Sequence, residues 1–325
     1  MTNATTTTFI TGATGFVGRE LLQQLLASQP NARLLALVRA TDHNALAQRR
    51  AAIVAGLPAS QADRLEAIRG DVSLPRFGLD DRAYDRVLEQ VDRAVHCAAS
   101  TRFDLSLEAA RRDNVASTET VLRLCRELRA RGRSARLDYV STAFVAGTRE
   151  GLVTEDELFV GQRFRNTYEQ TKLEAEGLCR AARSDLPVAI YRPSIVVGRQ
   201  RSGATTSYKT VYGPMRFLIG LYETCPAILN RLLPLPLRPD VPIDLVPVDY
   251  VAGAMAALWS RDDAVGRCFH LAAGTDGSAE VQELVHLTCD HFGSPRLRFV
   301  PPGRGLRAAG RLIAPLVRAA APRAM

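Results

Sequence analysis

The chain has 325 residues, of which 46% are hydrophobic and 23% are charged, and its formal net charge is +8. This length allows one large core, or one core with a smaller lobe attached. No apolar run reaches the ~18 residues that a membrane-spanning helix needs, so the composition indicates a globular protein that does not span a membrane. The first strand begins almost at Met1, which leaves no room for a secretory signal, and we therefore expect a cytoplasmic location.

The positive charge comes from arginine, which greatly outnumbers lysine. The arginines are dispersed over segments that fit solvated helix faces, and no nucleic-acid motif accompanies them, so we expect no nucleic-acid binding. The six cysteines show no CxxC pair and no metal-ligand spacing. We interpret them as buried thiols and expect no metal site.

Strand-like and helix-like segments alternate through the first two-thirds of the chain. This pattern predicts an α/β fold of the Rossmann type, a doubly wound parallel sheet with helices on both faces. The predicted strands are 7–10, 33–38, 65–69, 93–99, 136–141 and 188–191, and the predicted helices are 16–28, 83–90, 107–131 and 168–182.

The regular alternation ends near Pro193. Residues 202–247 mix glycine, proline and apolar residues without a period, which is typical of loops and short helices laid over a site. Their apolar character favours an apolar ligand, and packing against the main domain is the alternative. A helix at 249–260 and a strand at 268–273 follow. We therefore predict a cofactor-binding domain over 1–200 and a smaller C-terminal substrate-binding lobe with a tail over 201–325, within which 246–275 returns to the main domain.

A helix is predicted at 280–292, and a basic tail follows Pro301-Pro302. Four arginines of this tail would lie near one helical face, with apolar residues on another face. Pro315 interrupts the pattern, so a frayed or docked terminal helix is the favoured interpretation. Weak contact with a membrane surface is the alternative.

Three glycines, at positions 12, 15 and 18, follow the first strand and open the next helix. In such a turn the first glycine permits the tight bend, the second lets the backbone approach a pyrophosphate, and the third lets the helix pack closely on the strand. The helix N-terminus also favours phosphate charge. The motif predicts dinucleotide binding by Gly12, Thr14, Gly15, Phe16, Val17 and Gly18.

The residue that ends the second strand is Arg39. It lies where a residue beside the adenosine ribose selects the nicotinamide cofactor, and a guanidinium offers donors to a 2′-phosphate where a carboxylate would bind a 2′-hydroxyl. The sequence thus favours NADP over NAD, with a solvated strand end as the alternative. Asp71 and Val72 follow the third strand, where they would contact the adenine, although Asp71 would equally cap the next turn.

Tyr168 and Lys172 are one helical turn apart, so the phenol and the ammonium would share a face. A lysine at this position would lower the pKa of the tyrosine and make it an acid-base group. Ser141 and Thr142 follow the 136–141 strand, at the edge where doubly wound sheets bind ligands, and either hydroxyl would hold a carbonyl oxygen. Together these groups suit reduction of a carbonyl by a nicotinamide cofactor.

These motifs, together with Tyr191-Arg-Pro-Ser-Ile-Val-Val-Gly198 and Val246-Pro-Val-Asp-Tyr-Val251, resemble the extended short-chain dehydrogenase/reductase superfamily. The resemblance covers about residues 6–275. Leu37-Val-Arg39 and the segments around Ser141 and Tyr168 are most similar to fatty acyl-CoA reductases and to the thioester reductase domains of carboxylic acid reductases and peptide synthetases.

The resemblance implies that Thr142 binds the carbonyl oxygen, that Tyr168 donates the proton, and that Lys172 binds the nicotinamide ribose. It further implies that the cofactor is seated by Ala98, Asn114, Arg192 and Pro193. The implied reaction is NADPH-dependent reduction of an apolar acyl thioester, bound to CoA or to a carrier protein, to the aldehyde and onward to the alcohol.

Two alternatives remain open. One is a ketone or hydroxyl dehydrogenase of the same superfamily that acts on a steroid-like or β-keto substrate with the same residues. The other belongs to another class, a non-catalytic NADPH-binding regulator. Sugar-nucleotide epimerisation fits less well, because such relatives usually hold NAD with an acidic residue where Arg39 stands.

Overall fold

The computed structural model describes residues 5–208, 210–224, 237–293 and 299. Contacts divide the chain into two compact units. The first comprises residues 1–204 and 246–272, and the second comprises residues 205–245 and 273–325. The assignment of cofactor binding to the first unit and of substrate binding to the second stays a prediction.

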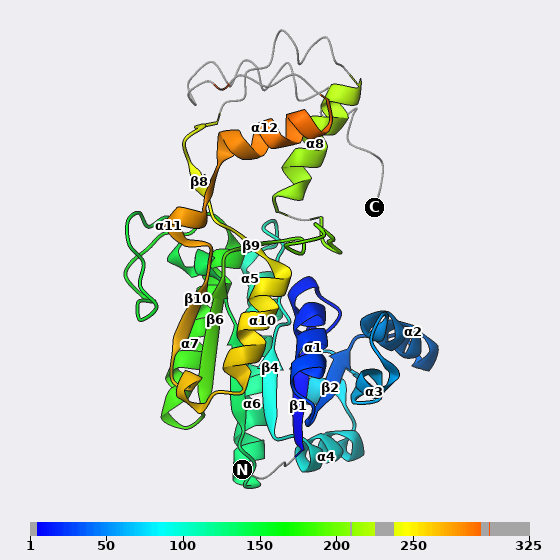
Figure 1. The fold of residues 1–325 in the computed structure, drawn as a ribbon. Coiled ribbons are helices and arrows are strands. Elements are labelled where there is room, and N and C mark those ends of the chain that lie inside the picture. Colours follow the sequence, from blue (N-terminus) through cyan, green and yellow to red (C-terminus); the bar gives the residue numbers. More distant parts are fainter. Residues whose placement is uncertain (1–4, 209, 225–236, 294–298, 300–325) are drawn as a thin grey trace. The chain divides into compact units, whose positions relative to one another are not determined.

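A seven-stranded parallel sheet forms the centre of the first unit, with the strand order β10-β6-β5-β4-β1-β2-β3 (Figure 1). The chain runs from β1 outward to β3 and then returns to the other side of β1, which places a topological switch point between β1 and β4. This confirms the predicted Rossmann-type sheet. The strands are β1 Thr6–Thr11, β2 Ala32–Val38, β3 Leu65–Arg69, β4 Arg93–His96, β5 Arg136–Val140, β6 Val188–Pro193 and β10 Cys268–Leu271.

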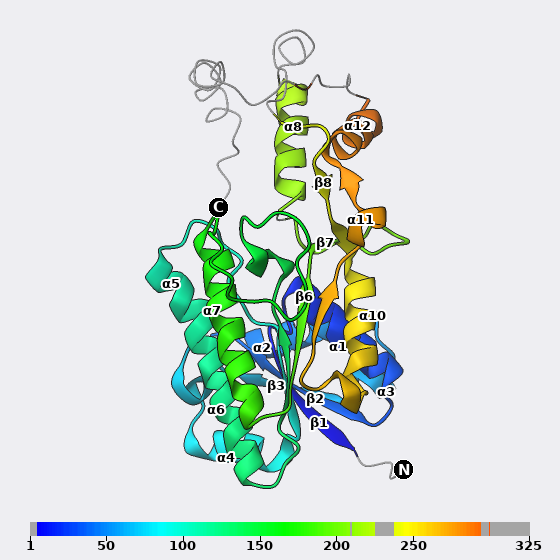
Figure 2. The same cartoon turned by 90° about the vertical axis from the view of Figure 1, so that its left-hand side faces the viewer.

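Helices cover both faces of this sheet (Figure 2). On one face α1 packs against α10, and on the other α6 packs against α4 and α7. The helices of this unit are α1 Phe16–Ser28, α2 His43–Val54, α3 Ala59–Ala62, α4 Asp81–Gln90, α5 Leu107–Arg111, α6 Ser117–Ala130, α7 Thr167–Ala181 and α10 Val248–Trp259.

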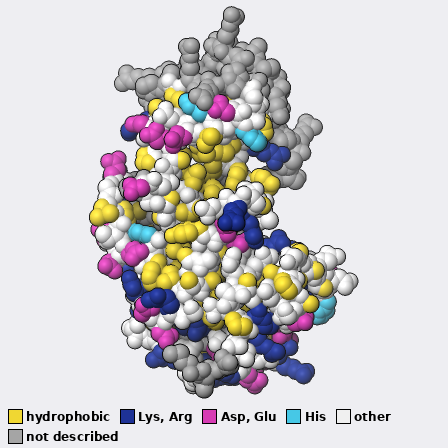
Figure 3. All heavy atoms as spheres, in the orientation of Figure 1, with side chains coloured by type: hydrophobic (Ala, Val, Ile, Leu, Met, Phe, Trp, Pro, Cys, Tyr) yellow, Lys and Arg dark blue, Asp and Glu magenta, His cyan; other side chains and the backbone are white. Residues whose placement is uncertain are grey.

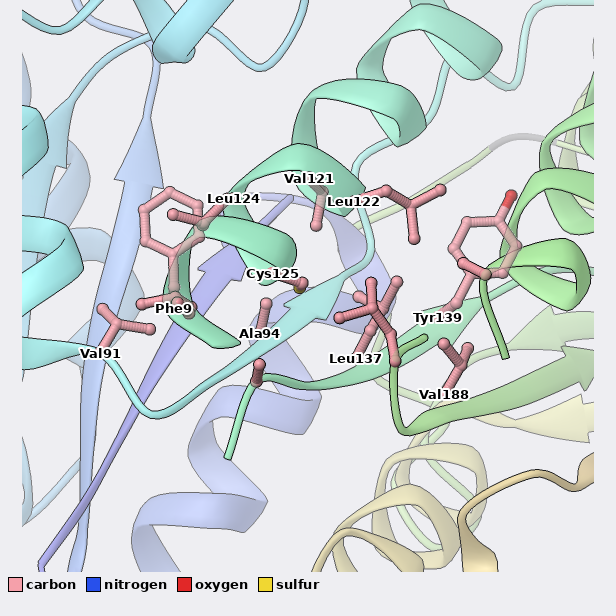
Figure 4. Close-up of a cluster of buried hydrophobic side chains, with 14 of the residues drawn as sticks. Phe9, Val91, Ala94, Val121, Leu122, Leu124, Cys125, Leu137, Tyr139 and Val188 are labelled. Atoms are coloured by element: carbon pink, nitrogen blue, oxygen red, sulfur yellow. The ribbon is translucent and has the colours of Figure 1, made fainter. Parts of the chain in front are cut away.

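The core beneath α4, α6 and α7 is built from apolar residues of the inner strands (Figure 4). Phe9 of β1, Ala94 of β4 and Leu137 of β5 are fully buried there. Val121 and Leu124 on the apolar face of α6 cover them, and the strands beneath are apolar on both faces.

One predicted helix is wrong in detail. Residues 107–131 form α5, a π-helical turn at Arg112–Ala116, and then α6. A π turn holds one extra residue and re-aims the side chains within it, which a regular 3.6-residue pattern cannot reveal. The sequence also missed α2, in which Ile53 alone is buried, because a solvated helix leaves almost no apolar stripe.

The described part of the second unit contains the helices α8 Tyr212–Thr224, α11 Gly274–Gly277 and α12 Val281–His291, of which α8 and α12 contact each other. A short antiparallel pair joins β8 Pro242–Ile243 to β11 Ala279–Glu280. Glu280 and Glu283 form a capping box that begins α12. The predicted basic tail helix lies outside the described residues. Among the described helices, none is long and apolar enough to cross a membrane.

Charged side chains are interspersed on the face drawn in Figure 3, where basic and acidic groups alternate over the first unit. Several arginines pair with carboxylates, such as Arg86 with Glu66 and Arg126 with Asp185. Exposed pairs of this kind each contribute little to stability. The cysteines at 125, 179, 268 and 289 are buried and Cys97 is partly buried, while Cys225 lies outside the described residues.

Candidate active site

The turn between β1 and α1 has the geometry of a phosphate-binding loop. Gly12 has a φ of +75°, and a Cβ there would lie 2.6 Å from the backbone nitrogen of Ala98. A Cβ on Gly18 would lie 2.2 Å from the Gly12 carbonyl oxygen, whereas Gly15 is exposed and serves as the N-cap of α1. Because the glycines carry no side chains, they leave the free N–H groups at the start of this 13-residue helix open to a ligand.

The other predicted cofactor residues follow neighbouring strands of the sheet. Arg39 directly follows β2 and is exposed, and within the described part of the chain its guanidinium has no hydrogen-bond or ion-pair partner. Thr14 is exposed in the glycine turn, and Phe16 and Val17 are half-buried in the first turn of α1. Ala98 follows β4, and its backbone N–H donates to Thr11 Oγ1 over 3.3 Å.

Asp71 follows β3 and takes the turn-capping role that the sequence left open. Its Oδ1 accepts hydrogen bonds from the backbone nitrogen and the hydroxyl of Ser73, at 2.9 and 2.8 Å. The adenine contact of Asp71 and of the half-buried Val72 stays a prediction.

Thr142 and Tyr168 are brought together by β5 and α7. Thr142 ends the loop after β5 and caps a short 3₁₀ turn by accepting from the Phe144 nitrogen at 3.3 Å. Asn166 caps α7 by accepting from the Glu169 nitrogen at 2.9 Å, which places Tyr168 in the first turn. The Thr142 hydroxyl lies near enough to the Tyr168 phenol to lower its pKa. This arrangement puts two hydroxyl groups where one carbonyl oxygen would meet both.

Lys172 lies one turn further along α7 and is only 3% exposed. Its Nζ donates to Tyr139 Oη and to the Val140 carbonyl oxygen of β5, each at 2.7 Å. Burial lowers the pKa of Lys172 to about 8, against the raising effects of Cys179, Glu176 and Cys97. The ammonium form still predominates at neutral pH, and one of its three N–H groups remains for a ligand.

The expected lowering of the tyrosine pKa is not found. Burial raises the pKa of Tyr168 to about 12, the Thr142 hydroxyl lowers it, and Glu169 raises it further. The Nζ of Lys172 makes its hydrogen bonds to Tyr139 and Val140 of β5. Tyr168 is therefore a neutral phenol at neutral pH, which is the form that donates a proton.

Ser141, the other candidate hydroxyl, makes a buried hydrogen bond within the protein. Its Oγ donates to Glu176 over 2.6 Å, and Glu176 also holds the guanidinium of Arg192 at 2.8 Å. Arg192 is fully buried and donates to the carbonyl of Glu157 as well. Arg192 thus ties β6 to α7 and to the loop at Glu157, and its part in seating the cofactor stays a prediction. Pro193 ends β6, and its carbonyl oxygen accepts from Thr142 at 3.4 Å.

Asn114 lies in the π-helical turn and is 2% exposed. Its Oδ1 accepts from the Ser100 nitrogen at 2.7 Å, and its Nδ2 donates to Thr171 Oγ1 at 3.0 Å. The side chain thus joins the loop after β4 to α7, and its contact with the cofactor stays a prediction.

Sequence reasoning missed three buried polar residues behind Lys172, namely His96, Thr118 and Tyr139. Each lies on a predicted element, but only the register of the strands brings them together.

Comparison with known proteins defines the class. The parallel sheet, the glycine turn and the Tyr168–Lys172 pair are those of an extended short-chain dehydrogenase/reductase, and the model of an NAD-binding family described as "Male sterility protein" matches residues 10–255. The chain belongs to this family of NAD(P)-dependent reductases. It therefore uses a nicotinamide cofactor.

Individual relatives are reductases. The chain is 30% identical over 316 residues to the L-2-aminoadipate reductase large subunit of Penicillium chrysogenum, matching 90% of this chain and 20% of that protein. It is 27% identical over 283 residues to fatty acyl-CoA reductase wat of Drosophila melanogaster, matching 77% of this chain and 53% of that protein. Thus the chain spans about a fifth of the first relative and about half of the second.

Among solved structures, the terminal R domain from the myxalamid PKS-NRPS biosynthetic pathway superposes with a TM-score of 0.80 at 30% identity. The match covers 97% of this chain and 77% of that one.

Substitutions at two glycines of this turn are expected to have different effects. Gly18→Ala is expected to lower the free energy of unfolding by about 1–3 kcal/mol, because its Cβ would overlap the Gly12 carbonyl. Gly15→Ala, whose Cβ would lie 3.1 Å from the same oxygen, is expected to weaken cofactor binding roughly tenfold and to change stability little. Thermal unfolding and fluorescence titration with NADPH measure the two effects.

Gly253→Ala is the matched control, since its Cβ would meet open space on α10. A Gly15→Ala protein that binds the cofactor as tightly as the wild type would contradict a phosphate-binding role for this turn.

Proposed function

We propose that this chain is an NADPH-dependent reductase of acyl thioesters, which releases the aldehyde and the thiol and can reduce the aldehyde further to the alcohol. The main support for a thioester substrate is the 30% identity to a terminal R domain in a match that covers 97% of this chain. The identity to an L-2-aminoadipate reductase and to a fatty acyl-CoA reductase supports the same choice. The acyl group would be carried on CoA or on a carrier protein.

The residues present fit a nicotinamide dinucleotide. The glycine turn leaves a cradle that a Cβ would fill, which suits a pyrophosphate, and the exposed guanidinium of Arg39 suits a 2′-phosphate. Lys172 would hold the nicotinamide ribose through its remaining N–H. When bound, NADPH supplies the hydride.

Thr142 and Tyr168 would act on the carbonyl oxygen. Addition of hydride to the thioester carbon turns this oxygen into the anion of a hemithioacetal, to which both hydroxyls donate hydrogen bonds. The carbonyl then forms again as the carbon–sulfur bond breaks, and the sulfur leaves as a thiol after protonation. In the second reduction the aldehyde oxygen takes the proton of Tyr168, which its raised pKa keeps in place at neutral pH.

The test is turnover by the purified protein of long-chain acyl-CoAs, of acyl groups on a carrier protein, of fatty aldehydes and of bulky ketones. We expect thioester-dependent NADPH oxidation with stoichiometric thiol release, and a loss of about 10²–10⁴-fold in Tyr168→Phe. Tyr84→Phe, on α4, is the control for loss of a phenol away from the site.

Two outcomes of this panel would contradict the proposal. Consumption of ketones without any thioester would establish the dehydrogenase alternative. Tight NADPH binding with no tyrosine-dependent turnover would establish the regulator. A preference between CoA and the carrier protein identifies the source of the thioester.

Arg39 carries the preference for NADPH over NADH. Arg39→Asp is expected to weaken NADPH binding by about ten- to a hundredfold, because a charge-assisted hydrogen bond to the 2′-phosphate is lost and a repulsion is gained. NADH binding is expected to stay equal or to improve. Dissociation constants for both cofactors measure the change.

Arg33→Asp is the matched control, since Arg33 is an exposed arginine near the opposite end of the same strand. Equal loss of NADPH affinity in both variants would show that net charge, and not a 2′-phosphate contact, is responsible.

A further inference from the structure

Behind Lys172 lies a row of buried polar side chains that the proposed mechanism does not use. Thr11, His96 and Tyr139 are register neighbours on the adjacent strands β1, β4 and β5. Side chains at matching positions of neighbouring parallel strands point to the same face of a sheet. Thr118 of α6 lies over this row, and all four residues are at most 1% exposed.

Counting donors fixes the direction of each hydrogen bond in this row. The hydroxyl of Thr118 lies 2.7 Å from the Asn114 carbonyl oxygen, which can only accept, so the single proton of Thr118 is used there. His96 Nε2, at 3.2 Å from Thr118 Oγ1, must then be the donor. His96 Nδ1 consequently accepts from Thr11 Oγ1 over 2.7 Å.

The protonation state of His96 agrees with this count. Burial, and then the charge of Lys172, lowers the pKa of His96 to about 3, so the ring is neutral and carries one proton. That proton lies on Nε2.

Tyr139 completes the row at the other end. Its ring packs against that of His96, with the two ring centroids 5.7 Å apart. Burial raises the pKa of Tyr139 well above its ordinary value, which keeps the proton on the phenol. Tyr139 Oη accepts a hydrogen bond from Lys172 Nζ, which lies 2.7 Å away.

We propose that Tyr139 is a positioning residue for Lys172, and that the His96 ring, fixed by Thr11 and Thr118, holds the Tyr139 ring in place. Tyr139 Oη and the Val140 carbonyl take two of the three N–H groups of Lys172 and leave the third for the nicotinamide ribose. This inference rests on the proposed role of Lys172 in cofactor binding.

The row is not a proton relay to solvent. The row ends at Thr11, whose hydroxyl oxygen accepts a hydrogen bond from the Ala98 backbone N–H. A backbone N–H does not pass on protons during turnover. The members of the row are at most 1% exposed, so no proton outlet exists within the part of the chain that the structure describes. Holding the ammonium is the function that this geometry supports.

The groups that bear on the charge of Lys172 come from both α7 and the sheet. Cys179 and Glu176 on α7 raise its pKa, and so does Cys97 after β4, while Tyr139 and His96 are neutral. Burial raises the pKa of Cys179 well above its ordinary value and that of Cys97 to about 12, so Glu176 is the titratable group that is charged at neutral pH. Loss of the Tyr139 acceptor therefore destabilises the ammonium without a replacement.

The experiment uses the composition of the chain, which contains only two lysines, Lys172 and Lys209. Protein labelled with ¹³C at the lysine Cε atoms gives two resonances to titrate by NMR, and Lys172→Met assigns them. Tyr139→Phe keeps the ring but removes the acceptor, and we expect the Lys172 midpoint to move to lower pH by about one pH unit.

Tyr191→Phe is the matched control. Tyr191 is also a fully buried phenol, on the neighbouring strand β6, but its Oη donates to Asp138 at 2.7 Å and not to the lysine. Its loss should reduce stability and leave the Lys172 midpoint where it is.

Thr118→Val provides a second route if Tyr139→Phe does not fold. It removes the acceptor that fixes the His96 ring against Tyr139, and it should move the midpoint in the same direction. A Lys172 midpoint that is unchanged in whichever of these variants folds would overturn the proposal.

Cofactor binding gives an independent readout. The ammonium of Lys172 is lost as the pH rises through its pKa of about 8, so NADPH affinity should fall above that pH in the wild type. In Tyr139→Phe this fall should begin at lower pH, whereas a merely structural defect would weaken binding equally at every pH. Neither readout requires a substrate, so a failure of the thioester proposal leaves both interpretable.

Discussion

A buried ammonium is the constraint on which the site depends. Lys172 is 3% exposed, and its charge is tolerated because a phenol and a backbone carbonyl of β5 accept its hydrogen bonds. Arginine supplies all but two of the chain's 42 basic residues, and yet lysine stands here. A guanidinium is larger and planar, whereas a compact ammonium donates from one nitrogen to both acceptors and adjusts its pKa on burial.

The sheet places the partners of this ammonium. Matching register across β1, β4 and β5 aligns Thr11, His96 and Tyr139, and the same strand ends carry the glycine turn and Thr142. The switch point between β1 and β4 therefore brings the glycine turn and the candidate catalytic hydroxyls to one edge. Glu176, held by Ser141 and Arg192, anchors α7 against β5 and β6 from the other side. The position of Tyr168 follows from these ties.

Local patterns in the sequence were sufficient for the sheet, for most helices and for the pairing of Tyr168 with Lys172. Their failures have a common cause. The π turn at Arg112–Ala116, the burial of Arg192 and the direction of Lys172 all depend on contacts between residues far apart in the chain. The raised pKa of Tyr168 is of the same kind, because burial outweighs a charge one turn away and spacing alone does not reveal burial. The turn geometry of Gly12 and Gly18 was predictable because it depends on the local spacing of the glycines, while the role of Arg39 stays a prediction.

The proposed delivery of hydride to a thioester carbon is tested most directly by isotope transfer. The substrates are an acyl thioester and NADPH that carries deuterium at the transferable position, and the products are analysed by mass spectrometry. We expect one deuterium at the carbonyl carbon of the aldehyde, two at the same carbon of any alcohol, and one thiol for each aldehyde formed. Deuterium that appears only in products of added ketones, with the thioester recovered intact, would contradict the proposal.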